Sequence, residues 1–190
     1  MKKVKVPYGR GMLSAEVDDA RLVGVFESAL PEAAPDERAE VERALNDPIG
    51  SPRLEELARG KRSAVIIASD HTRPVPSRIL MPCILKRLRK GSPEIRITIL
   101  IATGFHRGTT KEELIAKFGE EIVEQERIVV HDSADASMLV RLGTLPSGGE
   151  LILNRLAVEA DLLVAEGFIE PHFFAGFSGG RKSVLPGIAS

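Results

Sequence analysis

The sequence predicts an α/β fold in which a mostly parallel, doubly wound sheet follows an amino-terminal β-hairpin. Short runs rich in Val, Ile and Leu alternate with helical patterns, as expected of strands that helices bury on both faces. Ahead of these runs, apolar and polar residues alternate around a Gly-Arg-Gly turn, which is typical of a hairpin. The predicted parallel strands are Ser63–Ser69, Ile95–Ala102, Arg127–Val130 and Leu162–Ala165.

Helical patterns occupy the intervals between these strands. In Pro76–Lys90, apolar side chains recur every three or four residues and stop before Gly91, so this segment and its two flanking strands form a βαβ unit. Two more polar segments near the amino terminus are expected to form surface helices. The predicted helices are Asp36–Asn46, Arg53–Arg59, Pro76–Lys90, Lys111–Phe118 and Leu151–Glu159. Strands and helices in this alternation predict a Rossmann-like sheet.

Composition excludes several classes of protein. The 190 residues include 26 basic and 27 acidic side chains, no Trp and one Tyr, so a nucleic-acid partner is not expected. Cys83 is the only cysteine, which excludes a disulfide within the chain and a thiolate-rich metal site, and favours a reducing compartment. No apolar run approaches the length of a membrane span, and none follows the first lysines. We therefore expect a cytoplasmic protein without a membrane partner.

Polar residues follow the first predicted parallel strand, where loops and helix starts gather in such sheets. Asp70, His71, Thr72 and Arg73 form an unbroken polar run before two prolines. Exposed backbone N–H groups and a guanidinium could bind a phosphate or a carboxylate there. The alternative is a helix cap, with Arg73 paired to an acid. Four such residues in succession favour a ligand site.

Histidines follow the next two strands. His106 lies between Gly104 and Gly108, where the backbone can approach a ligand and an imidazole can transfer protons. The alternative is a solvated loop histidine. His131 stands beside Asp132, but neighbouring side chains on a strand point in different directions. We therefore expect His131 to be a surface residue or a capping group.

The segment after the last predicted strand, residues 166–190, carries the richest chemistry. Four of the seven phenylalanines crowd there with His172, Arg181 and Lys182, which pairs apolar walls with a base and two cations, as a ligand pocket requires. The alternative is an apolar loop that packs on the core. Gly176–Ser183 departs from a P-loop because Arg181 stands where that motif has glycine, so ATP hydrolysis is not favoured.

Three motifs together carry a resemblance to a known family. They are SDHTRPVPS at 69–77, TGFHRGTT at 103–110 and EPHFFAGFSGGRKSVLPGIAS at 170–190. With them, the chain closely resembles the nickel-dependent lactate racemase family, whose members are nickel-pincer-nucleotide 2-hydroxyacid racemases. The resemblance implies that residues 1–190 are most of the amino-terminal α/β cofactor-binding domain, and that the family's second domain is absent from this chain.

The resemblance also implies roles for individual residues. Lys182 would form a thioamide link to a nickel-pincer pyridinium nucleotide, while His106 and His172 would be paired acid-base catalysts. No metal-ligating residue is carried over to this chain, since the family's nickel-binding histidine lies further along. The implied cofactor-binding residues of the polar turn are Asp70, His71, Thr72 and Arg73.

The implied reaction interconverts the enantiomers of a small 2-hydroxy acid, with lactate as the default. One histidine takes the hydroxyl proton while hydride moves to the cofactor, and the other serves the mirror-image substrate. Arg73 would hold either the substrate carboxylate or the cofactor phosphate. Cofactor-biosynthesis proteins are implied as suppliers, and residues 1–190 alone are expected to lack racemase activity. The alternative is a non-redox phosphate- or nucleotide-binding module with Lys182 unmodified.

Overall fold

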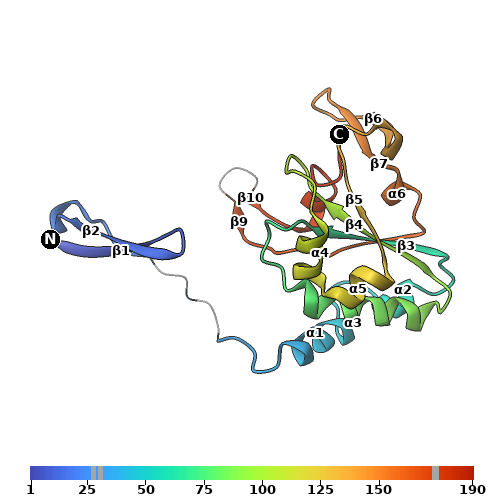
Figure 1. Ribbon diagram of the computed structural model, residues 1–190, viewed down its shortest axis with the longest axis horizontal. Coiled ribbons are helices and arrows are strands. Elements are labelled where there is room, and N and C mark those ends of the chain that lie inside the picture. The colour runs from blue at the N-terminus through green and yellow to red at the C-terminus, as the bar shows by residue number, and fades with distance from the viewer. Residues whose placement is uncertain (27–28, 30–31, 173–175) are drawn as a thin grey trace. The chain divides into compact units, whose positions relative to one another are not determined.

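The computed structural model describes residues 1–26, 29, 32–172 and 176–190 (Figure 1). It divides into two compact units, Met1–Pro35 and Asp36–Ser190, which are described separately. No described helix is long and apolar enough to cross a membrane.

The first unit contains the predicted hairpin. Strand β1 (Lys2–Tyr8) pairs antiparallel with β2 (Gly11–Val17) along its whole length. Gly9 turns the chain with a φ of 58°, in the left-handed region that glycine adopts without a steric penalty. A single 3₁₀ turn, η1 (Asp19–Arg21), follows. The prediction of an amino-terminal hairpin is confirmed.

The second unit is built on a four-stranded parallel sheet, which confirms the predicted α/β class. The order β5-β4-β3-β8 places β4 and β5 on one side of β3 and β8 on the other. The carboxyl ends of β3 and β8 therefore flank the point where the strand order changes direction, the usual ligand position in such sheets. The strands are β3 (Ser63–Ser69), β4 (Arg96–Ala102), β5 (Arg127–Val130) and β8 (Leu162–Ala165).

Apolar side chains cover both faces of this sheet. Alternate residues of β3 and β4, such as Ile66 and Ile99, pack against α3, α4 and α5. The intervening residues, such as Ile67 and Leu100, pack against α6 and the buried Ile188. This alternation follows from the period of two of a β-strand. The helices are α1 (Glu37–Asn46), α2 (Leu54–Leu57), α3 (Ser77–Gly91), α4 (Lys111–Phe118), α5 (Glu120–Gln125) and α6 (Arg155–Val158).

The predicted helix Leu151–Glu159 is wrong over its first half. Glu150–Asn154 is strand β7, which pairs antiparallel with β6 (Leu139–Thr144), and only α6 is helical. The hydrogen bonds to β6 decide the conformation, because a short apolar run fits either element until a partner strand is present. Asn154 then starts α6, since its side chain accepts a hydrogen bond from the N–H of Leu156.

The predicted surface helices differ in burial. All the side chains of α1 are at least partly exposed, as expected. In α2, however, Glu55 is buried and accepts hydrogen bonds from Arg87 and Lys90 of α3. Burial raises the pKa of Glu55, but backbone and side-chain hydrogen bonds, including those from Lys90 and Arg87, lower it to about 2. Helix α2 is thus fixed to α3 by an ion pair that local sequence does not reveal.

Candidate functional site

The turn between β3 and α3 is organised by Asp70. Its side chain is buried, and its Oδ1 accepts hydrogen bonds from the N–H of Thr72 at 3.0 Å and from the Thr72 hydroxyl at 2.7 Å. Asp70 does not cap α3, which begins after Pro76 without a side-chain cap. The tightly bonded turn instead presents the second carboxylate oxygen to the neighbouring loop.

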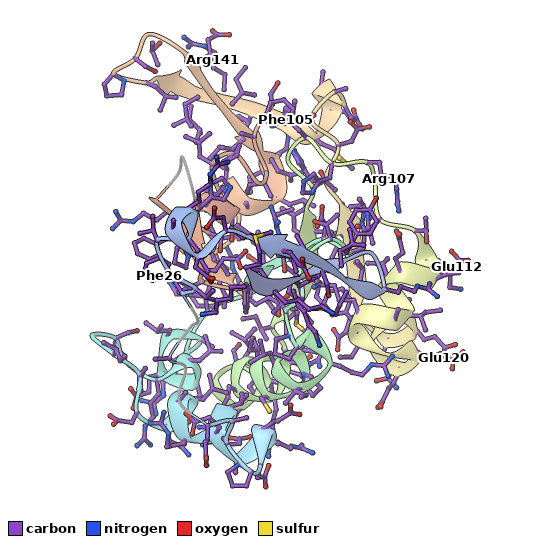
Figure 2. The ribbon with its side chains drawn as sticks, turned by 90° about the vertical axis from the view of Figure 1, so that its left-hand side faces the viewer. Phe26, Phe105, Arg107, Glu112, Glu120 and Arg141 are labelled. Atoms are coloured by element: carbon purple, nitrogen blue, oxygen red, sulfur yellow. The ribbon has the colours of Figure 1, made fainter. Side chains whose placement is uncertain are left out.

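That oxygen contacts His106, which follows β4. Nδ1 of His106 lies 2.5 Å from Oδ2 of Asp70 and 3.4 Å from Oγ1 of Thr72. The Asp70 side chain is 1% exposed and that of His106 is 42% exposed. A buried carboxylate thus orients a ring that reaches solvent. Phe105, the residue before His106, is 98% exposed on the same loop (Figure 2).

Electrostatics favours an ionised Asp70. Burial raises its pKa, but hydrogen bonds from Thr72 and His106 outweigh burial and lower the pKa below its usual range. Since an ionised carboxylate only accepts hydrogen bonds, Nδ1 of His106 donates, and in the neutral ring Nε2 carries the lone pair. The arrangement can take a proton at Nε2 and stabilise the resulting imidazolium. The sequence did not reveal this pair, whose members are 36 residues apart.

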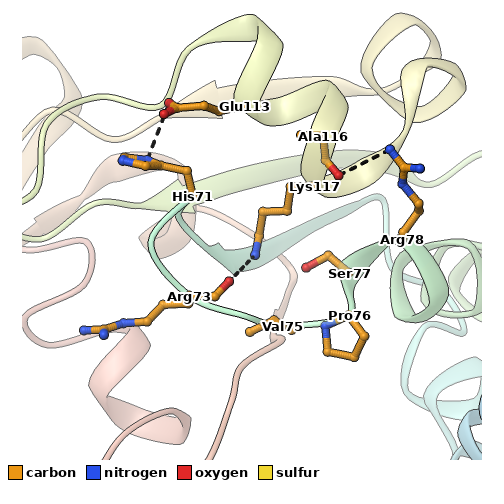
Figure 3. A pocket seen from close by; sticks show the side chains of 9 residues that line it. All are labelled: His71, Arg73, Val75, Pro76, Ser77, Arg78, Glu113, Ala116 and Lys117. Atoms are coloured by element: carbon orange, nitrogen blue, oxygen red, sulfur yellow. Dashed lines mark hydrogen bonds and ion pairs between the residues drawn. The ribbon is translucent and has the colours of Figure 1, made fainter. Parts of the chain in front are cut away.

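His71 faces α4 rather than His106. Its Nδ1 lies 3.1 Å from the hydroxyl of Thr109 and 3.7 Å from a carboxylate oxygen of Glu113 (Figure 3). Glu113 also accepts hydrogen bonds from Arg107 and from the N–H of Thr110, and these lower its pKa to about 2. His71 is therefore held at the amino end of α4.

A pocket of about 640 Å³ opens between the β3–α3 turn and α4 (Figure 3). Lys117 of α4 reaches across it, with its Nζ 3.4 Å from the carbonyl oxygen of Arg73. Burial lowers the pKa of Lys117. The side chain of Arg73 points away from Lys117. The pocket is lined by His71, Arg73, Val75, Pro76, Ser77, Arg78, Glu113, Ala116 and Lys117.

A second buried carboxyl lies at the end of β8. Glu166 is 4% exposed, and its Oε1 accepts a hydrogen bond from the hydroxyl of Ser77 at 2.7 Å. Its Oε2 has no hydrogen-bond partner among the described residues. Burial raises the pKa of Glu166. Neither Glu166 nor Lys117 was recognised as a site residue from the sequence. Glu166 directly follows a predicted strand, which is a signal for a site residue, whereas the sequence around Lys117 carries no such signal.

The segment from Gly167 to Ser190 folds back on itself in two steps. Strand β9 (Pro171–His172) pairs with β10 (Gly176–Phe177), which places His172 opposite Gly176. The 3₁₀ turn η3 (Gly180–Ser183) then carries Lys182. Residues 173–175, where two of the phenylalanines counted above fall, lie outside the described residues.

Glycines allow close backbone contacts within this segment and between this segment and the His106 loop. A Cβ on Gly179, whose φ is 70°, would lie 2.9 Å from the carbonyl oxygen of Phe168, so only glycine fits. The N–H of Gly104 donates to the carbonyl oxygen of Gly187 at 3.0 Å. The loop of His106 and the segment of Lys182 are therefore neighbours, while Asp70, Thr72 and His106 make direct contact.

His131 corrects one prediction. It is neither a surface residue nor a capping group, because it is 2% exposed and its ring bonds to Asn154 and to the carbonyl oxygen of Ala189. The buried position follows from its place at the end of β5, under the carboxyl-terminal segment. Among the described residues, no group of three or more His, Cys, Asp and Glu side chains could hold a metal ion.

Solved structures of known proteins share this fold. The lactate racemase apoprotein from Thermoanaerobacterium thermosaccharolyticum matches with a TM-score of 0.91 and 58% identity, over 100% of this chain and 44% of that one. A protein from Thermotoga maritima matches with a TM-score of 0.65 and 24% identity, over 85% of this chain and 40% of that one. The second match shows the fold alone.

Sequence comparison identifies the family. The chain is 57% identical over its whole length to the curated lactate racemases of Thermoanaerobacterium thermosaccharolyticum and Lactiplantibacillus plantarum, and it spans 45% of the length of each. Residues 8–190 match the family model described as the lactate racemase N-terminal domain. The resemblance noted in the sequence is confirmed: this chain belongs to the family of lactate racemase N-terminal domains.

Proposed function

We propose that this chain forms the cofactor-binding part, and supplies the acid-base histidines, of a nickel-dependent 2-hydroxyacid racemase with lactate as the default substrate. The observation that carries the proposal is the pair of His106 and Asp70, a solvent-reaching imidazole oriented by a buried carboxylate. The proposal also treats the sheet as Rossmann-like, with the site at the carboxyl ends of β3 and β8.

In this function His106 removes the hydroxyl proton of one enantiomer of the substrate through Nε2. Asp70 accepts the Nδ1 hydrogen bond, keeps the ring in the required tautomer and stabilises the imidazolium that forms. His172 is proposed as the equivalent base for the other enantiomer. Arg73 supplies the cation for the substrate carboxylate or the cofactor phosphate.

The residues fit a nickel-pincer pyridinium nucleotide in two respects. Gly180 has a φ of 55° and open space where a Cβ would stand, so a flat group could approach the backbone beside Lys182. The hydroxyl of Thr72, the guanidinium of Arg73 and the amine of Lys182 supply the chemistry that an anionic, covalently attached nucleotide requires. When bound, the cofactor would supply the hydride acceptor, and separate biosynthetic proteins would supply the cofactor.

A non-redox phosphate- or nucleotide-binding module is the second candidate. The pocket beside Lys117 favours it, because a partly buried lysine next to the start of α3 can bind an anion reversibly. This candidate predicts that Lys182 stays unmodified and that nickel has no effect.

The deciding experiment uses the protein expressed from its complete reading frame together with the cofactor-making proteins. Intact mass and nickel content are compared with those of Lys182→Ala, and racemisation is measured for His106→Ala. We expect an adduct that Lys182→Ala loses. We expect His106→Ala to keep the adduct while kcat falls on the order of 10²- to 10⁴-fold. An unmodified Lys182, in a preparation where a known racemase is modified, would instead favour the binding module.

A further inference from the structure

His131 lies between the two segments that carry His106 and Lys182. Its N–H continues the sheet by donating to the carbonyl oxygen of Ile101 at 3.0 Å. Its own carbonyl oxygen accepts a hydrogen bond from the buried hydroxyl of Thr103 at 2.8 Å, at the start of the His106 loop. The backbone of His131 thus fixes the root of that loop.

The His131 ring contacts the other segment. Nε2 lies 3.1 Å from the carbonyl oxygen of Ala189, and since a carbonyl only accepts, Nε2 carries the proton. Nδ1 therefore accepts the hydrogen bond from Nδ2 of Asn154, also at 3.1 Å. The orientation of the Asn154 amide is fixed in turn, because its Oδ1 accepts from the N–H of Leu156. The ring is neutral, and both of its nitrogens are satisfied.

Further bonds connect Ala189 back toward Lys182. The carboxyl-terminal residues lie beside β7 (Figure 1). There the N–H of Asn154 donates to the carbonyl oxygen of Ile188, and Leu153 pairs with Ala189 in an isolated antiparallel β-bridge. Ile188 is fully buried. The N–H of Gly187 donates to the carbonyl oxygen of Lys182 at 3.1 Å. A continuous set of contacts therefore runs from His131 to the turn that holds Lys182.

We propose that His131, supported by Asn154, is a positioning residue that holds the Lys182 segment in register with the His106 loop. Losing a ring hydrogen bond would leave the Ala189 carbonyl or the Asn154 amide unpaired in a buried environment, and opening of the segment would relieve that cost. His131 itself is not a catalytic residue, because both ring nitrogens are engaged in the interior. The inference rests on the proposed function only for the role of Lys182.

Hydrogen exchange on the cofactor-free protein tests the inference. His131→Leu removes both ring hydrogen bonds. We expect the amides of Gly187 and Ile188 to exchange roughly tenfold faster or more, as local opening becomes easier, while the amides of β3 keep their protection. Unchanged exchange at Gly187 and Ile188 would overturn the proposal. If racemase function is wrong, the exchange result still stands, because the measurement involves no cofactor and no turnover.

Two conservative variants separate the ring contacts. His131→Gln places an amide donor near the Nε2 position and should restore protection of the segment, since it can still bond to Ala189. His131→Asn places an acceptor near the Nδ1 position and should restore less protection of the segment than His131→Gln does. Ile97→Ala, in the apolar cluster on the helix α3 face, is the control for general destabilisation. Equal loosening of residues 184–190 in Ile97→Ala and in His131→Leu would contradict a positioning role.

Discussion

Asp70 and Glu166 occupy equivalent places, one residue beyond the neighbouring strands β3 and β8, yet their pKa values are shifted in opposite directions. Both are buried, and burial raises the pKa of each carboxyl. Asp70 accepts hydrogen bonds from Thr72 and His106, which lower its pKa overall. Glu166 accepts one side-chain bond, from Ser77, and its pKa stays raised.

At this edge of the sheet, the balance between burial and hydrogen-bond partners therefore sets the direction in which the pKa of a carboxyl shifts. An ionised Asp70 can orient and stabilise a protonated histidine. Glu166, whose pKa is raised by burial, instead joins the end of β8 to the start of α3 through Ser77. One carboxyl is suited to proton transfer and the other to holding two elements together.

The largest expected effect comes from neutralising Asp70. Asp70→Asn keeps the shape of the side chain but removes the charge and allows the wrong tautomer of His106. Under the proposed function, kcat for racemisation should therefore fall on the order of 10²- to 10⁴-fold. Glu166→Gln makes the same chemical change one strand away and should cost far less activity. Racemisation rates of both variants, in the cofactor-loaded protein from the complete reading frame, check this. Equal losses would remove the distinction drawn between the two carboxyls.

A smaller effect concerns pH and stability. Because the folded pKa of Glu166 is raised above 4.5, the stability that its neutral form contributes is present below pH 4.5 and is lost as pH rises through the folded pKa. Glu166→Gln removes this loss. The melting temperature of the variant minus that of the unmodified protein should therefore be larger at pH 8 than at pH 5.

Thermal melts at the two pH values measure that gain. Ser77→Ala supplies the companion variant, because it deletes the hydrogen bond that lowers the pKa of Glu166 and should steepen the decline of stability with pH. A difference between Glu166→Gln and the unmodified protein that shrinks toward pH 8 would contradict the raised pKa.

The smallest effect is expected for Thr72→Val, which deletes the hydroxyl bond to Asp70 and should cost about 1 kcal/mol of unfolding free energy at pH 7. The folded pKa of Asp70 lies below 3.8, so the cost is present above that pH and fades as pH falls through the folded pKa. Urea unfolding at pH 7 and at pH 3 provides the measurement. A cost that grows in acid would show that Thr72 acts otherwise than by stabilising the ionised carboxylate.

Local sequence determined the elements whose own pattern is sufficient. The strands Ser63–Ser69, Arg127–Val130 and Leu162–Ala165 have the predicted bounds, because uninterrupted β-branched and aliphatic runs fit a sheet that is buried on both faces. The helix over Lys111–Phe118 has the predicted bounds, and the structure shows that Thr110 caps its start and that Gly119 follows its end. The polar turn at Asp70 and the loop of His106 were recognisable because each follows such a strand.

Tertiary structure alone decided how these pieces meet. Leu151–Asn154 becomes a strand because β6 supplies hydrogen bonds, and His131 is buried because the carboxyl-terminal segment covers it. The contacts of Asp70 with His106 and of Glu166 with Ser77 depend on which strands are adjacent, and strand order is a long-range property. Local pattern fixes the backbone of each element, whereas the partners of a buried polar group, and hence the direction of its pKa shift, are set only when distant segments pack together.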